Sequence, residues 1–334
     1  GLGDKPERML AALPFFHAYG LTMNVTLAQF IGGELVILPK PDMSLIMQLM
    51  KKHTPTWVPG VPTLYERIVK AAEDQEIPIK GVRAAFSGAS TLPSDTVNKW
   101  GNYTGGLLVE GYGLTETTAP ITVGRPDRLK IGTVGHPLGG NKVRIAEDGE
   151  ILIRGPVVFD GYHGMPKASA EAMEDDFFRT GDIGALDEHG FLRITGRKKD
   201  VIITAGGKNV YPTPMEEALR QHRLIEHVVV VGENRPFVGA LITLDSEALT
   251  QWALDRELSL TPAEAATDPT VLASIQEAVD QVNAGVSRAE SIRRFRILDH
   301  PFTEDSGHVT QSQKLKRAQV IEDHAEDVEA LYRR

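Results

Sequence analysis

The chain has 334 residues, of which 41% are hydrophobic and 24% charged, with a formal net charge of −9 and no cysteine. This length suffices for two or more hydrophobic cores, and the acidic balance argues against nucleic acid or an anionic membrane surface as the main partner. The lack of cysteine excludes disulfides, cysteine nucleophiles and thiolate metal sites, and it fits a cytoplasmic protein. No apolar run approaches the ~20 residues of a membrane helix, so we expect no transmembrane segment. Peripheral membrane contact and self-association into a homo-oligomer stay open.

The first residues, GLGDKPERMLAALP, include neither the apolar core of a signal peptide nor an initiator Met. They lead almost directly into an apolar segment that is typical of a strand. We therefore expect the chain to begin inside a domain.

Short apolar runs alternate with helical patterns over residues 9–110. The runs MLAALP, ELVILP, TWVP, VRAAFSG and LLVEGYG predict strands. Between them we expect a helix that Asp42 caps, and two helices opened by proline, from Pro62 to Glu73 and from Pro93 to Trp100. This alternation predicts a largely parallel sheet with helices packed on it.

The pattern changes twice after residue 130. Short strands split by turn signals over residues 131–196 predict a small antiparallel sheet or barrel. From about residue 200, HVVVVGE and FVGALITLD predict strands, Pro269 to about Gly285 predicts a helix, and Thr213 to Glu216 predict a capping box. The expected fold is therefore α/β, with part of a large domain over 1–199 (α/β to about 130, then β-rich) and a smaller α+β domain over 200–334.

The segment EGYGLTETT, Glu110 to Thr118, concentrates groups that suit a phosphate and a metal. Glycines let backbone N–H groups approach an anion, Thr115 can donate to a phosphate oxygen, and Glu116 can hold Mg²⁺. A tight turn with a helix cap explains the same residues equally well.

Six segments resemble, in order, the motifs of the adenylate-forming (ANL) superfamily, which includes acyl-CoA synthetases, luciferases and the adenylation domains of peptide synthetases. They are PFFHAYG (14–20), SGAS (87–90), YGLTET (112–117), FFRTGDIGALDEHGFLRITGRKKDVI (177–202), AGGKNVYPTPMEEAL (205–219) and VTQSQKLKR (309–317). The tail from Val286 most resembles bacterial long-chain fatty acyl-CoA synthetases.

The resemblance implies ATP as the nucleotide and assigns its contacts. Asp182 is similar to the carboxylate that accepts both ribose hydroxyls, Arg197 to the arginine near the ribose and phosphates, and Tyr112 to the residue that stacks on adenine. A turn-capping Asp, a surface Arg and a core Tyr are the structural alternatives. The other implied nucleotide-site residues are Gly88, Ala89, Glu110, Gly111, Thr115, Gly206, Gly207 and Lys208.

For catalysis the resemblance implies Thr115, the Mg²⁺ ligand Glu116, and Lys314, whose ammonium would stabilise charge as a carboxylate attacks the α-phosphate. Gln313 stands where shorter members of the family have glycine, so Lys316 competes with Lys314 for this role. His17 resembles a residue that borders the acyl site, although a helix-capping or core histidine explains it as well.

Asp200 matches the family's hinge between the large and small domains. The small domain is expected to rotate about it between two half-reactions, so that the Gly206–Lys208 loop enters the site for the second. An ordinary turn residue at 200 and a solvent-exposed Lys208 are the alternatives.

The family's phosphate-binding loop, rich in Ser, Thr and Gly and ending in Pro-Lys-Gly, has no match in the chain. We therefore expect a chain truncated at its N-terminus, which by itself binds ATP poorly and turns over little.

The implied activity is that of an acid–thiol ligase. It would convert a fatty, long-chain acid and ATP with Mg²⁺ to acyl-AMP and pyrophosphate, and then transfer the acyl group to CoA with release of AMP. Two alternatives remain, an adenylating ligase that loads a carrier protein and a non-catalytic relative that kept the fold.

Overall fold

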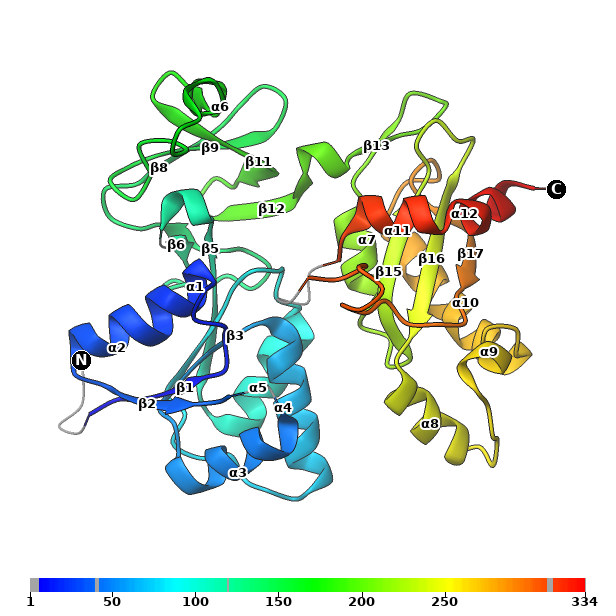
Figure 1. Ribbon diagram of the computed structural model, residues 1–334, viewed down its shortest axis with the longest axis horizontal. Helices are drawn as coiled ribbons and strands as arrows, with labels where there is room; N and C mark the ends of the chain where they lie inside the picture. Colours follow the sequence, from blue (N-terminus) through cyan, green and yellow to red (C-terminus); the bar gives the residue numbers. More distant parts are fainter. Residues whose placement is uncertain (1–5, 40–41, 119, 311–314, 334) are drawn as a thin grey trace. The chain divides into compact units, whose positions relative to one another are not determined.

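The computed structural model describes residues 6–39, 42–118, 120–310 and 315–333. The chain forms two compact units, residues 1–194 and 195–334. The division falls within β12 (Leu192–Arg197), just before Asp200, where the sequence predicts the boundary. We describe each unit by itself, with the elements labelled in Figure 1.

A seven-stranded sheet forms the first layer of unit 1, in the order β2-β1-β3-β4-β5-β6-β7. Each neighbouring pair among β2, β1, β3, β4 and β5 is parallel. The pairs β5–β6 and β6–β7 are antiparallel. The prediction of a largely parallel sheet is confirmed. The strands are β1 (Arg8–Ala11), β2 (Glu34–Ile37), β3 (Trp57–Gly60), β4 (Ala84–Ser87), β5 (Leu107–Gly113), β6 (Pro120–Val123) and β7 (His136–Pro137).

Helices cover this sheet and supply its core. Tyr65 and Trp100 are fully buried, and their rings meet edge to face at 5.0 Å. Asp42 caps α3 as predicted, because its carboxylate accepts the N–H of Leu45 at 2.8 Å. Pro93 is the N-cap of α5 rather than its first residue. The helices are α1 (Ala18–Gly20), the π-helix η1 (Leu21–Thr26), α2 (Leu27–Ile31), α3 (Met43–His53), α4 (Pro62–Asp74) and α5 (Ser94–Thr104).

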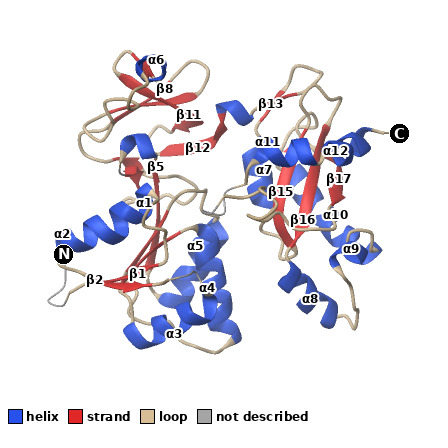
Figure 2. Cartoon of the chain, viewed as in Figure 1, coloured by secondary structure: helices blue, strands red, loops and turns tan. Residues whose placement is uncertain are grey.

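A small antiparallel sheet follows in unit 1, as the sequence predicts (Figure 2). Its core joins Ile151, Ile153 and Leu192 to Tyr112 and Ile121, so it packs against the end of β5. The elements are β8 (Lys142–Ile145), β9 (Glu150–Arg154), α6 (Pro166–Glu171), β10 (Met173–Glu174), β11 (Phe177–Leu186) and β12.

Unit 2 is built on the sheet β15-β16-β17, which is covered on both faces. Alternate valines of β15 point to opposite sides: Val228 and Val230 join the core of α7, α8 and α10, whereas Val229 and Val231 join the core of α11 and α12. The elements are β13 (Ile202–Ile203), β14 (Asn209–Val210), α7 (Pro212–Leu219), β15 (Ile225–Val231), β16 (Val238–Leu244), α8 (Ser246–Leu254), α9 (Pro262–Ala265), α10 (Pro269–Asn283), β17 (Ile292–Ile297), α11 (Arg317–Asp323) and α12 (Ala325–Tyr332).

The predicted capping box from Thr213 to Glu216 is wrong. Helix α7 begins at Pro212, its N-cap is Tyr211, and no side chain caps it. Glu216 instead accepts the N–H of Val230 on the neighbouring strand at 2.7 Å. The helix starts earlier because Pro212 suits its first position, and the buried strand offers Glu216 a better partner.

Within the described ranges, no helix is both long enough and apolar enough to span a membrane.

Candidate active site

The loop after β5 is a fixed turn. Residues 115–117 form a short 3₁₀-helix, η2 (Thr115–Thr117), in which the buried Thr117 hydroxyl accepts the N–H of Leu114 at 2.9 Å. Thr22 of η1 donates its hydroxyl to the carbonyl of Thr118 at 2.9 Å. The turn with a helix cap is therefore present, and it leaves the Thr115 side chain exposed.

Glu116 lies half-buried in this turn beside Tyr162. The Tyr162 hydroxyl donates to Glu116 Oε1 at 3.1 Å, and the Glu116 carbonyl accepts the N–H of Phe159 at 2.8 Å. Burial, and then the charge of Glu116, raise the pKa of Tyr162, so the phenol keeps its proton and donates it to the Glu116 side chain. The described residues form no group of three or more acidic or histidine side chains that could hold a metal alone. One carboxylate still fits Mg²⁺, because this ion commonly takes its remaining ligands from substrate phosphates and water.

Tyr112 and Asp182 meet although they are 70 positions apart. The Tyr112 hydroxyl donates to Asp182 Oδ2 at 2.6 Å, and both side chains are buried. Asp182 lies where the register of β11 shifts between Arg179 and Ile183, after Gly181 with φ +70°. This irregularity aims the carboxylate at the end of β5. Two residues that the resemblance assigns to adenine and ribose are thus brought together.

The SGAS turn lies at the end of β4, and Ala89 there adopts φ +70°. Glu110 is buried and its Oε1 accepts the N–H of Leu92 at 3.0 Å, so this acid holds the turn in place. A Cβ at Gly88 would lie 3.4 Å from the Tyr19 ring and 3.6 Å from the carbonyl of Gly111. Both are ordinary van der Waals distances, so the Tyr19 ring and the end of β5 lie directly against Gly88.

Tyr19 lies against Gly88 of the candidate site and was not predicted from the sequence. Its hydroxyl donates to the carbonyl of Phe86, and its burial raises the pKa of the phenol. The signal was available, because Tyr19 belongs to the PFFHAYG segment from which only His17 was selected. His17 itself is the N-cap of α1, and its Nδ1 accepts the N–H of Tyr19 at 3.1 Å. The helix-capping interpretation of His17 is therefore observed, and its acyl-site role remains a prediction.

The remaining predicted residues belong to unit 2. Arg197 ends β12 and Asp200 ends η3 (Lys198–Asp200). Gly206 and Gly207 lie in the β13–β14 hairpin, where the backbone of Gly207 has φ +73°. Lys208 follows them, and its Nζ lies 3.8 Å from Glu290 Oε1. Lys314 lies outside the described residues, whereas the N–H of Lys316 donates to the carbonyl of His308 at 2.8 Å.

Two family models match the sequence. The model described as "AMP-binding enzyme" matches residues 2–163, and that described as "AMP-binding enzyme C-terminal domain" matches residues 199–334. Together they cover most of the predicted site residues, whereas Asp182 and Arg197 lie between the two matches.

Similar proteins include long-chain-fatty-acid–CoA ligases. The chain is 39% identical to FadD15 of Mycobacterium bovis over 98% of its own length and 62% of that protein. It is 38% identical to the ligase of Bacillus subtilis over 71% of its length and 44% of that protein. The chain thus spans less than two thirds of these relatives. Among solved structures, ATP-bound MatB from Rhodopseudomonas palustris matches with a TM-score of 0.75 and 27% identity, over 96% of this chain and 61% of MatB.

Proposed function

This chain belongs to the AMP-binding enzyme family, and from that premise we propose that the complete natural protein carrying it is a fatty acyl-CoA ligase. The relatives named above are long-chain-fatty-acid–CoA ligases. A long-chain fatty acid is therefore the proposed substrate, with ATP and CoA as co-substrates. Because the chain spans 62% of FadD15, the activity is proposed for the whole protein.

The observation that carries the proposal is the contact between Tyr112 and Asp182 beside the Thr115–Thr117 turn. A carboxylate can accept several hydrogen bonds, ribose hydroxyls included, and the Tyr112 ring beside Asp182 offers a stacking surface. The exposed Thr115 hydroxyl and the Glu116 carboxylate lie a few residues further along the same turn.

In the first half-reaction, a carboxylate oxygen of the fatty acid attacks the α-phosphorus of ATP and pyrophosphate leaves. Thr115 is proposed to donate to a phosphate oxygen, and Glu116 would hold the Mg²⁺ that neutralises phosphate charge when it is bound. Lys314 is proposed to stabilise the negative charge that builds up between the two reactants. His17 is assigned to the acyl side of the site, and Gly88 and Ala89 to the wall that lines both the nucleotide and the acyl pocket.

In the second half-reaction, the CoA sulfur attacks the acyl carbonyl, the thioester forms, and AMP leaves with the electron pair of the broken bond. We assign this step to a second arrangement reached by rotation about Asp200, with Gly206, Gly207 and Lys208 replacing Lys314. Arg197 is assigned to the nucleotide in this scheme.

The test is fatty-acid-dependent exchange of labelled pyrophosphate into ATP, followed by thioester formation with CoA. We expect exchange in the parent and a loss of at least ~10-fold in Asp182→Asn, because the neutral amide is a weaker acceptor for ribose hydroxyls. Asp176→Asn, an exposed position before β11, is the matched control and should behave like the parent. A folded parent that exchanges no pyrophosphate with any fatty acid would point to the non-catalytic relative. Exchange without CoA thioester would point to a carrier protein as acceptor.

A further inference from the structure

The sheet of unit 2 has two outer strands, and their outer sides differ. On β15, the N–H of Val230 donates to Glu216 Oε1 and its carbonyl accepts from Arg317 Nη1, each at 2.7 Å. Glu216 and Arg317 also form an ion pair with each other. Side chains of unit 2 thus occupy the backbone groups of β15 at this position, and a further strand cannot pair with them.

The outer side of β17 is closed at its start and open beyond it. Asn283 of α10 bonds to both the N–H and the carbonyl of Ile292, at 2.8 and 2.9 Å. Beyond this residue β17 pairs with β16 alone among the described strands (Figure 1). The N–H of Leu298 donates to a carbonyl of β16. Backbone groups alternate in direction along a strand, so those of Phe295 and Ile297 face the outer side.

A groove of about 340 Å³ lies against this part of β17. Its lining comes from the strand and from one helix on each face of the sheet. It consists of Gln276 of α10, residues 293–296 of β17, and Ala330 and Leu331 of α12. The open side of the strand is therefore flanked by two helices.

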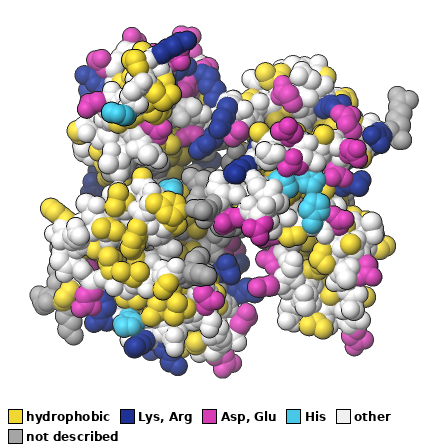
Figure 3. Space-filling view, in the orientation of Figure 1, with side chains coloured by type: hydrophobic (Ala, Val, Ile, Leu, Met, Phe, Trp, Pro, Cys, Tyr) yellow, Lys and Arg dark blue, Asp and Glu magenta, His cyan; other side chains and the backbone are white. Residues whose placement is uncertain are grey.

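The groove is lined by three arginines, although the chain as a whole is acidic. Arg293 and Arg294 are exposed, and the side chain of Arg296 is 50% exposed. The formal net charge of the chain is −9, and Figure 3 shows acidic side chains spread over the visible face of the molecule. A locally basic strand on an acidic protein favours a partner that carries negative charge.

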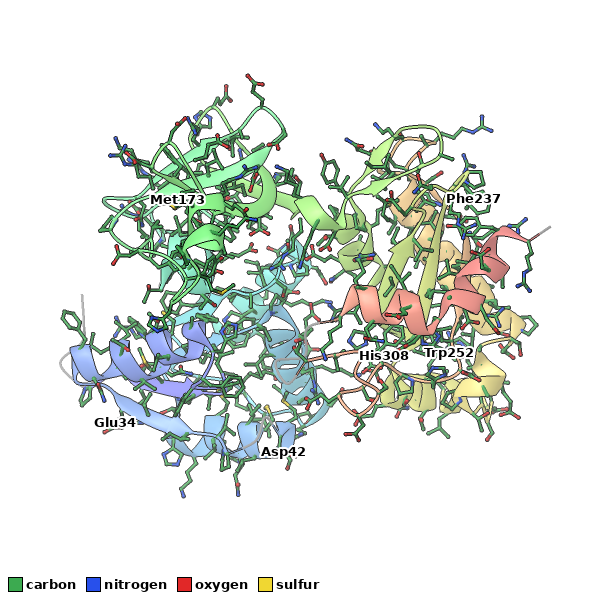
Figure 4. The ribbon with its side chains drawn as sticks, turned by 45° about the horizontal axis from the view of Figure 1, so that its top comes forward. Glu34, Asp42, Met173, Phe237, Trp252 and His308 are labelled. Carbon is green, nitrogen blue, oxygen red and sulfur yellow. The ribbon has the colours of Figure 1, made fainter. Side chains whose placement is uncertain are left out.

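Contacts within unit 2 hold two of these guanidinium groups beside the groove. Arg294 donates to the carbonyl of Leu331 at 3.0 Å, and its guanidinium lies 5.6 Å from the ring centroid of Phe237, which is labelled in Figure 4. Arg296 Nε lies 2.8 Å from Asp327 Oδ1 of α12. A guanidinium has more N–H donors than these contacts use, so each arginine can bind a further carboxylate.

The side chains of β17 alternate between the two faces of the sheet. Arg294 and Arg296 contact α12, whereas Phe295 packs on the core that α10 shares with α7 and α8. A neighbouring strand has the same alternation. Acidic side chains on it would lie opposite the two arginines, and apolar side chains would lie opposite Phe295.

We propose that the outer side of β17 is a docking site for an extended acidic segment of a partner protein, which adds a strand to the sheet of unit 2. Backbone hydrogen bonds to Phe295 and Ile297 would supply affinity, and the arginines would select acidic side chains. A second copy of this chain fits poorly, because two β17 strands side by side would place arginines opposite arginines. The inference goes beyond the proposed catalytic function and does not depend on it.

The test is fluorescence anisotropy of the complete natural protein with a labelled, end-blocked peptide, Thr-Glu-Val-Glu-Val-Glu-Thr. We expect saturable binding that weakens as salt is added. The same peptide N-methylated at its central Glu and at the following Val keeps its charge but loses one backbone donor on each edge. It should bind at least ~10-fold more weakly, because a hydrogen bond is lost and a methyl group obstructs whichever edge pairs.

Two protein variants test the arginines. Arg294→Gln/Arg296→Gln should weaken binding of the acidic peptide by about 10-fold, because its carboxylates lose their charged partners. The charge-matched control is Arg220→Gln/Arg223→Gln, which changes two exposed arginines of unit 2 outside the groove and should bind like the parent. Thermal unfolding checks that both variants are folded. The comparison of the two peptides needs no variant, so it decides the question even if one does not fold.

Four outcomes would overturn the inference. A folded parent that does not bind the peptide would show that the arginines only protect an edge strand from pairing. Equal binding of the N-methylated peptide would show attraction between charges without an added strand. Parental affinity in Arg294→Gln/Arg296→Gln, or an equal loss in the control variant, would show that the peptide binds elsewhere. A dimer in sedimentation velocity that the peptide dissociates would assign this strand to a second copy of the chain.

Discussion

At the scale of single residues, the contacts in the candidate site distinguish residues that hold its backbone in place from residues that offer a polar surface. The sequence motifs did not make this distinction. Glu110 holds the SGAS turn through Leu92, and His17 caps α1. Asp182, in contrast, is brought to Tyr112 by a register shift in β11. The first two contacts stabilise the walls of the site, and the third forms a polar surface that a nucleotide can use.

The Tyr112 hydroxyl can be tested directly. Tyr112→Phe removes the hydrogen bond to Asp182 and keeps the ring, so we expect the free energy of unfolding to fall by about 1–2 kcal/mol. The KM for ATP should rise several-fold, because Asp182 would be less well oriented toward the ribose. Chemical denaturation and steady-state kinetics check the two effects. Tyr103→Phe, which removes a hydrogen bond to Ile77 elsewhere in unit 1, should change stability alone.

The catalytic lysine is the second prediction at this scale. Lys314→Ala in the complete natural protein should lower acyl-adenylate formation by roughly 10²–10³-fold, the loss expected for one charge-stabilising group. With premade acyl-adenylate it should form thioester near the parental rate, and Lys316→Ala should change neither step much. The reverse pattern would assign the role to Lys316. An equal loss of both half-reactions in both variants would contradict the two-arrangement mechanism.

At the scale of elements, the N-termini of the helices show when a side chain caps its own helix and when it bonds elsewhere. Asp42 caps α3 and Asp268 caps α10, and each accepts N–H groups of the first turn. Glu216 has the spacing of a capping residue but faces a buried strand and an arginine instead. A capping pattern therefore works where no stronger tertiary partner competes.

Asp42→Ala tests the cap of α3. The variant leaves the N–H of Leu45 without its side-chain acceptor, so the free energy of unfolding of unit 1 should fall by about 1 kcal/mol. Ser44→Ala, an exposed change in the first turn of the same helix, should have less than half this effect. Equal effects of the two variants in urea denaturation would show that the Asp42 contact does not contribute to stability.

At the scale of the whole molecule, the two units have separate cores. We expect a largely buried histidine, His227, to make unit 2 sensitive to acid. Desolvation, with a smaller effect of Arg220, lowers the pKa of His227 on β15 from its usual 6.5 to about 4. Its Nδ1 has no hydrogen-bond partner among the described residues. His227 is therefore protonated below about pH 6.5 in the unfolded chain, but only below about pH 4 in the folded unit 2.

The stabilising effect of neutral His227 should be complete above pH 6.5 and should be lost as the pH falls toward 4. Its size is about 3 kcal/mol over this interval, from a shift of about two and a half units. In His227→Gln, the loss of unfolding free energy of unit 2 between pH 7 and pH 4 should be smaller than in the parent by this amount. Denaturation at pH 7, 5.5 and 4 measures it. The transition of unit 1 is the internal control and should not differ between parent and variant. Identical pH profiles for unit 2 would contradict the prediction.

The sequence by itself determined the fold class and the family, and it predicted part of the order of elements. Alternating strand and helix patterns predicted the parallel sheet, and the change of pattern after residue 130 predicted the antiparallel sheet. These features depend on local periodicity and on short motifs, which contiguous residues carry. Tyr112 and Asp182 were also selected from the sequence, through the motifs in which they lie.

Only the tertiary structure decided which distant residues meet. The Tyr112–Asp182 bond, the ring of Tyr19 against Gly88, and the Glu216–Arg317 pair each join segments that no periodicity connects. The choice of Val230 rather than a helix N-terminus as the partner of Glu216 is of the same kind. Such contacts depend on burial and register, because a polar group removed from water bonds to whichever partner the packing brings within reach.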